Sequence, residues 1–132
     1  MIRPEIKRGE IWYHNTNKSA VGNIQAGSRP VIIVSNDLAN KHSPVILAAP
    51  LTTKPKKNLP THVIFTIDGE FNTALVEQAG PILVSELVNR KYILEKYIMD
   101  QVDEAIAIAY GLKDKPSYHD INSTGADIVV AI

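Results

Sequence analysis

The feature that most limits the fold of this chain is a series of short β-rich segments with little sequence between them. Val, Ile, Thr and aromatic residues dominate these segments, and Gly, Pro, Asn and Asp mark the turns. The predicted strands are residues 11–15, 30–35, 45–51, 61–67, 73–78 and 82–84. Such short spacings leave no room for crossover helices. The sequence therefore predicts a mainly β fold, a largely antiparallel sheet curled into a small closed or half-open barrel.

The apolar spacing then changes to that of a helix. One stripe is formed by Leu94, Ile98, Val102, Ala105, Ile106 and Ala109, which predicts a long helix packed on the barrel. Gly111 stands where a helix C-cap is expected. The pattern indicates one domain over residues 1–112. Residues 113–132 read as a polar tail, whose apolar end at 128–132 is expected to add an edge strand or dock on a partner.

Composition narrows the class of protein. A chain of 132 residues has room for one ordinary domain, and no apolar run approaches the roughly 20 residues that span a bilayer. There are no cysteines, and the charged segment Met1 to Glu10 has no apolar signal core, so the expected location is the cytoplasm. The net charge is zero, yet residues 1–60 carry +6 and residues 61–132 carry −6. This asymmetry fits contact with a polyanion, and equally a merely dipolar surface.

Metal-dependent chemistry is not indicated. The four histidines, His14, His42, His62 and His119, do not stand three to five residues apart, and no acidic pair brackets them. We expect neither a metal nor another cofactor.

A glycine-bounded loop before the second predicted strand is the most informative segment. Glycines let a backbone approach a ligand and present its N–H groups, and Arg29 at the junction offers a planar charged fork to phosphate oxygens. On spacing alone, a flexible hairpin with Arg29 paired to Asp37 or Glu10 is favoured over a ligand site. The candidate substrate-binding residues of this loop are Gly22, Asn23, Gln25 and Gly27.

A second group of candidates surrounds the end of the third predicted strand. A hydroxyl at Thr52 can donate to a phosphate, and the lysines that follow can hold neighbouring phosphates, although such a loop is more often simply solvated. Glu77 and Gln78 can read base edges or face water. Trp12 and Tyr13 are interpreted as core rather than stacking surfaces, and His42 as an exposed loop residue. The basic residues of the loop are Lys54, Lys56 and Lys57.

Taken together, these segments resemble the MazF/PemK family of toxins from bacterial toxin–antitoxin pairs. The resemblance runs from Ile6 to Ala109, and its strength lies in the order of the matching motifs. They are residues 7–13, 22–27, 29–37, 49–52, 59–63, 76–78 and 102–105. The resemblance implies an SH3-like barrel with a C-terminal helix. It also implies a homodimer that cuts single-stranded mRNA at short sequences without a metal and is silenced by a cognate antitoxin. The family's catalytic arginine and threonine match Arg29 and Thr52.

The chemistry is consistent with these two side chains. The ribose 2′-hydroxyl can attack the adjacent phosphorus and give a 2′,3′-cyclic phosphate and a 5′-hydroxyl, so no protein nucleophile is required. Arg29 would stabilise the charge on the phosphoryl oxygens, and Thr52 would donate to one of them or orient the leaving group. The general base stays unassigned, because neither arginine nor threonine is a good base at neutral pH.

The sequence also departs from the family pattern, which leaves other functions open. Ile24 replaces an acidic loop residue, and Gly80 and Pro81 stand where the family often has arginine and threonine. Cleavage preference is therefore not carried over, and loss of the arginine would weaken activity. The alternatives are a non-catalytic gyrase poison of the related CcdB type, and a barrel that binds RNA without cutting it.

Overall fold

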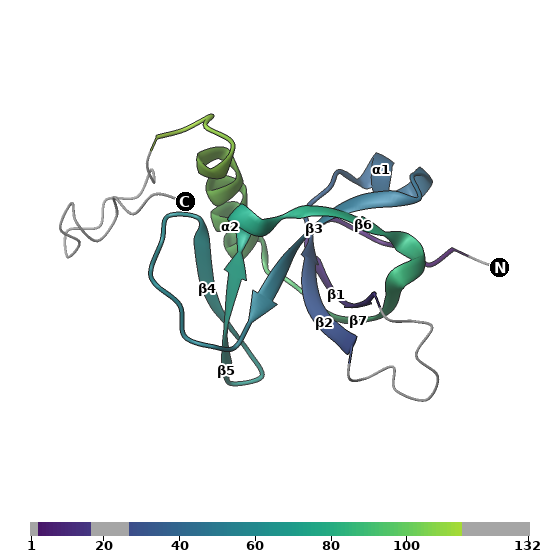
Figure 1. Ribbon diagram of the computed structural model, residues 1–132, viewed down its shortest axis with the longest axis horizontal. Helices are drawn as coiled ribbons and strands as arrows, with labels where there is room; N and C mark the ends of the chain where they lie inside the picture. Colours follow the sequence, from purple (N-terminus) through teal and green to yellow (C-terminus); the bar gives the residue numbers. More distant parts are fainter. Residues whose placement is uncertain (1–2, 17–26, 115–132) are drawn as a thin grey trace.

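The computed structural model describes residues 3–16 and 27–114 (Figure 1). Its strands are β1 (Glu10–Asn15), β2 (Ser28–Ile33), β3 (Val45–Thr52), β4 (His62–Ile67), β5 (Glu70–Leu75), β6 (Gly80–Leu83) and β7 (Leu87–Ile93). The helices are α1 (Asp37–His42), α2 (Lys96–Ala109) and the 3-10 turns η2 (Val76–Gln78) and η3 (Val84–Glu86). No helix in these described ranges is long and apolar enough to cross a membrane.

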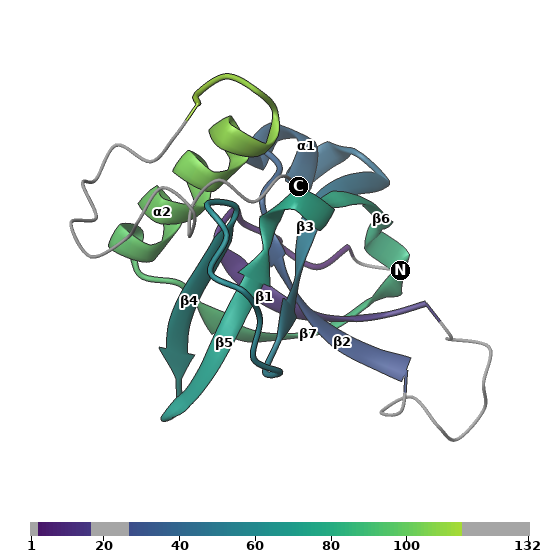
Figure 2. The same cartoon turned by 60° about the vertical axis from the view of Figure 1, so that its left-hand side comes forward.

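The sheet is antiparallel, as the short connections predict. Its strand order is β4-β5-β3-β2-β1-β7, and β6 pairs with β3 beyond the point where β3 contacts β5. β3 therefore takes part in both halves of the sheet, which curls around it into a half-open barrel (Figures 1 and 2). The mainly β fold with one long C-terminal helix is confirmed.

Several strand bounds were wrong, and two elements were not predicted. The second strand is Ser28–Ile33 rather than 30–35. Residues 76–78 form η2 rather than the end of a strand, since β5 runs from Glu70 to Leu75. The sixth strand is Gly80–Leu83 rather than 82–84. β7 and α1 were missed. The sequence of β7 does not predict a strand because its middle residues are exposed and polar. The sequence of α1 does not predict a helix because six residues are too few to show a period.

Side chains on the two faces of the central strands form two separate cores. Ile11, Ile32 and Leu51 belong to the first, which α2 covers. Trp12, Val31 and Ala48 belong to the second, which β6 and the start of β7 enclose. Because strand side chains alternate between faces, the neighbours of these residues can be assigned to a face from the register alone.

The long helix follows the predicted stripe and stop. It begins at Lys96, two residues after the first residue of the stripe, and Leu94, Ile98, Val102 and Ala105 are all buried. It packs against β4 and η2 (Figure 2). Gly111 adopts a φ of 77°, and the N–H groups of Gly111 and Leu112 donate to Ile108 and Ala107. This is a Schellman motif, which confirms the predicted C-cap.

Candidate nucleic-acid interface

Arg29 and Thr52 lie at the same end of two paired strands. In the β2–β3 register, Val31 faces Pro50 and Ile33 faces Ala48, so Arg29 and Thr52 occupy the next positions on the same face of the sheet. Arg29 is exposed, with one guanidinium nitrogen 3.2 Å from the Ser28 carbonyl oxygen, and Thr52 is half-buried. The alternation therefore points both side chains away from the first core, toward the open end of the second.

The strands separate where these residues stand. The register between β2 and β3 stops at Val31 and Pro50, and β3 then pairs with β5 through Leu51–Ala74 and Thr52–Thr73. Both views show the start of β2 and the end of β3 diverging (Figures 1 and 2). Arg29 and Thr52 are thus held on neighbouring strands at the point of divergence rather than pressed together as an ordinary cross-strand pair.

The basic loop between β3 and β4 is anchored at both ends. At its start, the Lys54 N–H donates to the Thr52 hydroxyl oxygen over 3.1 Å. At its end, Nδ1 of His62 lies 2.7 Å from the Lys57 carbonyl oxygen. The predicted residues Lys54, Lys56 and Lys57 are all exposed. The loop therefore presents three positive charges directly after Thr52.

Glu77 is not a free base-reading group but part of a small polar cluster. Its carboxylate accepts the Thr61 hydroxyl at 3.1 Å and lies 3.1 Å from Nε2 of His62, whose side chain is only 5% exposed. Both ring nitrogens of His62 consequently face acceptors, one of them in the basic loop. His62 and Thr61 were missed as parts of the site, although both fall in a motif that carries the family resemblance.

The remaining predicted residues are placed as follows. Gln78 is exposed at the end of η2, and Gly27 is half-buried directly before β2. Gly22, Asn23 and Gln25 lie outside the described residues. Glu10 and Asp37 do not hold Arg29: Arg90 and Trp12 bind the Glu10 carboxylate, and Arg8 and Asn40 bind that of Asp37.

The two aromatic residues of β1 also have partners. Trp12 is buried in the second core, as expected, and donates to Glu10. Tyr13 accepts a hydrogen bond from Lys91, which raises the pKa of that lysine, and the ammonium lies 5.2 Å from the ring centre. Neither ring is therefore offered for stacking. His42 is exposed, but in the last turn of α1 rather than in a loop.

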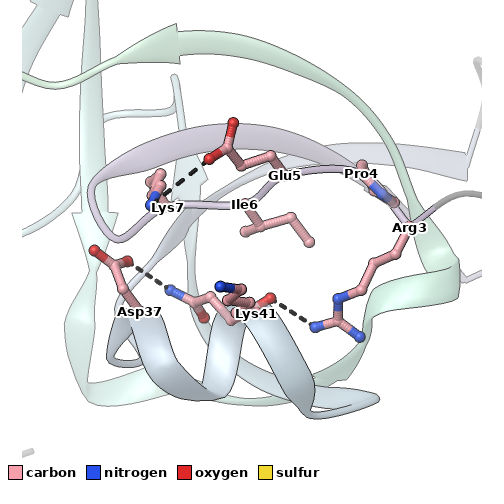
Figure 3. Close-up of a pocket in the computed structure, with 8 residues that line it drawn as sticks. Arg3, Pro4, Glu5, Ile6, Lys7, Asp37 and Lys41 are labelled. Carbon is pink, nitrogen blue, oxygen red and sulfur yellow. Dashed lines mark hydrogen bonds and ion pairs between the residues drawn. The ribbon is translucent and has the colours of Figure 1, made fainter.

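A pocket of about 400 Å³ lies elsewhere, between the N-terminal segment and α1 (Figure 3). The Arg3 guanidinium donates to the carbonyls of Asn40 and Ser43 at 2.6 Å, and Lys7 pairs with Glu5. α1 connects the far ends of β2 and β3, so the pocket is separated from Arg29 by about 13 Å of strand at least. It is not part of the same site.

No three His, Asp or Glu side chains gather closely enough to hold a metal ion in the parts of the chain that the structure describes.

Known structures share this fold. An endoribonuclease from a mycobacterial species, solved in complex with its cognate antitoxin, matches with a TM-score of 0.66 and 23% identity over 82% of this chain and 97% of that chain. MazF from Deinococcus radiodurans matches with a TM-score of 0.65 and 19% identity over 82% of this chain and 98% of that one. These likenesses define the fold class as a small β barrel with a C-terminal helix.

The sequence comparisons identify the family. Residues 7–110 match the profile of the PemK-like, MazF-like toxins of type II toxin–antitoxin systems. Endoribonuclease EndoA of Bacillus subtilis (strain 168) is 34% identical over 116 residues, which cover 83% of this chain and 97% of that protein. The chain belongs to the PemK-like, MazF-like toxin family, and the resemblance inferred from its motifs is confirmed.

Proposed function

We propose that this toxin is an endoribonuclease that cleaves single-stranded RNA, chiefly mRNA, at short sequences without a metal. The observation that carries the proposal is the placement of Arg29 and Thr52 on one face where β2 and β3 diverge, directly before a loop with three exposed lysines. Its support from relatives is that EndoA and the mycobacterial neighbour are both named endoribonucleases.

Each group has a defined role in this reaction. The 2′-oxygen attacks phosphorus, the bond from phosphorus to the 5′-oxygen breaks, and negative charge accumulates on the phosphoryl oxygens. Arg29 neutralises this charge, and the Thr52 hydroxyl donates to a phosphoryl oxygen. The basic loop between β3 and β4 holds the neighbouring phosphates, whereas Gln78 and the loop before β2 contact the bases. Glu77 has an indirect role: its contacts with Thr61 and His62 hold η2 and the basic loop in place.

The protein's partners follow from the same proposal. It acts in the cytoplasm, where mRNA is found, and a cognate antitoxin silences it. It is a homodimer, supported by an exposed apolar surface on β3 and β6. In this surface Val45 faces Leu83, and Leu47 lies beside Pro81. The three aliphatic side chains are 42–45% exposed, and in the described part of the chain the outer edge of β6 pairs with no other strand.

The direct test is cleavage of a long single-stranded RNA in EDTA. Wild type should yield fragments with 5′-hydroxyl ends that a kinase labels without prior phosphatase treatment. Arg29→Ala should slow cleavage by about 10²–10³, and Thr52→Val, which keeps the shape but removes the hydroxyl, by about 10-fold or more. Lys41→Ala, an exposed cation on α1, is the matched control and should cut normally.

Two results would contradict the proposal. RNA that folded wild-type protein retains but leaves intact would indicate the non-cleaving RNA-binding alternative. Binding to gyrase that survives Arg29→Ala, with RNA intact, would indicate a poison of the CcdB type.

A further inference from the structure

The proposed reaction needs a group that takes the proton from the 2′-hydroxyl, and neither Arg29 nor Thr52 is suited to that role. An imidazole lies next to Arg29. His14 is directly opposite Arg29 in the β1–β2 register, one step beyond the Trp12–Val31 pair. Since Trp12 and Val31 both enter the second core, His14 shares the face on which Arg29 and Thr52 stand.

A carboxylate holds this imidazole. Nε2 of His14 lies 2.8 Å from Oε1 of Glu86, and the two side chains are 14% and 23% exposed. Glu86 ends η3 immediately before Leu87, the residue that pairs with His14 on β7. The contact therefore links β1 to the start of β7, which are already paired, although His14 and Glu86 lie 72 positions apart in the sequence.

The geometry determines which nitrogen is available. An ionised carboxylate only accepts hydrogen bonds, so Nε2 of His14 carries a proton and donates it to Glu86. The neutral ring then has its lone pair on Nδ1, and within residues 3–16 and 27–114 no hydrogen bond to Nδ1 occurs. A histidine with one nitrogen donating to a carboxylate and the other open as an acceptor is arranged to act as a base.

We propose that His14 is the general base of this toxin and that Glu86 is its positioning residue. This assignment rests on the proposed ribonuclease function. Nδ1 takes the 2′-hydroxyl proton as the 2′-oxygen forms its bond to phosphorus. The bond to the 5′-oxygen then breaks, and that oxygen takes a proton from water. The imidazolium returns its proton to the hydroxide so formed, and the reaction is balanced.

The surroundings of His14 support the imidazolium that forms. Glu86 stabilises its positive charge. Arg29, which in the described residues is the other charged group next to His14, is engaged by the substrate phosphate during the reaction. The paired position on β7 is the apolar Leu87, and Arg90, one row further along β7, is bound to Glu10.

The test compares His14→Gln and His14→Ala with wild type in single-turnover cleavage from pH 5 to 8. An RNA oligonucleotide that spans a mapped wild-type cut serves as the substrate. Gln keeps an N–H that can donate to Glu86 but cannot take a proton, so it separates catalysis from packing. Both variants should be slower by about 10²–10⁴ and should lose the rise in rate with pH that wild type shows. His42→Gln, an exposed histidine on α1, is the matched control.

Two further measurements sharpen the assignment. Glu86→Gln should lower kcat and leave KM unchanged, a split that a purely structural contact would not produce. On RNA with sulfur in place of the 5′-oxygen, the leaving group needs no proton. The His14→Gln defect should persist on this substrate, and recovery to the wild-type rate would show that His14 is an acid rather than the base.

Different results would refute the ribonuclease function and the role of His14. Wild-type protein that leaves RNA intact would refute the ribonuclease function together with the role of His14. Wild-type protein that cuts RNA while His14→Gln cuts equally fast, with the same pH profile, would refute only the role of His14.

Discussion

Glu10 is the residue whose replacement tests most directly how the β1 region is held. Its carboxylate is 4% exposed and accepts the Lys7 N–H at 2.9 Å, the indole N–H of Trp12 at 2.9 Å and an Arg90 guanidinium N–H at 3.0 Å. Glu10→Ala removes all three acceptor contacts and leaves the buried indole N–H without a partner. An unsatisfied buried donor costs about 1–3 kcal/mol, and with the space left behind we expect a loss of about 3 kcal/mol in the free energy of unfolding.

Two further variants separate the acceptor role of Glu10 from its charge. Glu10→Gln still offers one oxygen to Lys7 and Trp12, but its amide nitrogen replaces the oxygen that accepts from Arg90, so the ion pair and its hydrogen bond are lost. Arg90→Ala leaves the two N–H donors in place. Because the Arg90 side chain is 50% exposed, water screens this ion pair, and each variant should cost only about 1 kcal/mol.

Urea unfolding gives the free energies and thermal unfolding gives the midpoints. Both are followed by the fluorescence of Trp12, the chain's single tryptophan, at one fixed protein concentration. The midpoint of thermal unfolding should fall by roughly 12 °C for Glu10→Ala and about 4 °C for the other two variants. Equal losses for Glu10→Gln and Glu10→Ala would refute the reasoning, since charge rather than hydrogen-bond acceptance would then dominate.

Three other predictions concern RNA binding, assembly and pH. A Cβ at Gly80 meets no atom within 4 Å, so Gly80→Arg should fold and steepen the salt dependence of binding to uncleavable 2′-O-methyl RNA by about 0.7 log units per log unit of salt; an unchanged slope would contradict this. Leu47→Lys should convert the proposed dimer to a monomer in sedimentation experiments, and a persistent dimer would show that the interface lies elsewhere. The Arg8 backbone N–H donates to Asp37 at 2.6 Å and lowers the pKa of that carboxyl. The stabilisation by the Asp37 carboxylate is complete above its pKa in the unfolded chain, near ~4. It is lost as the pH falls through the lower pKa of the folded protein. The stability gap between wild type and Asp37→Asn should therefore narrow in acid, and a gap that stays constant would contradict this.

Most of the fold follows from local sequence patterns. Alternating and continuous apolar segments indicate the strands of both cores, and the spacing from Leu94 to Ala105 indicates α2. β7 was not predictable in this way because Asn89, Arg90 and Lys91 form the exposed middle of a strand at the edge of the sheet. Such a strand is specified by its pairing with β1 rather than by its own pattern.

Part of the candidate site can likewise be predicted from the sequence, and part cannot. Arg29 and Thr52 can be proposed from the sequence because each stands in a motif shared with the family. The contacts of His14 with Glu86 and of His62 with Glu77 join residues 72 and 15 positions apart. Such pairs are determined by the strand register and by the insertion of η2, neither of which local spacing reveals.

Two prolines give the divergence of β2 and β3 a main-chain origin. Because Pro50 has no N–H, Val31 and Pro50 form a pair without mutual hydrogen bonds, and the next pair along the ladder would require an N–H from Pro30, which has none. The wedge between these strands is therefore a property of the main chain rather than of the side chains that line it. The separation of the two strands is therefore set by the backbone, so substitutions in the loop after β3 should leave the spacing between Arg29 and Thr52 unchanged.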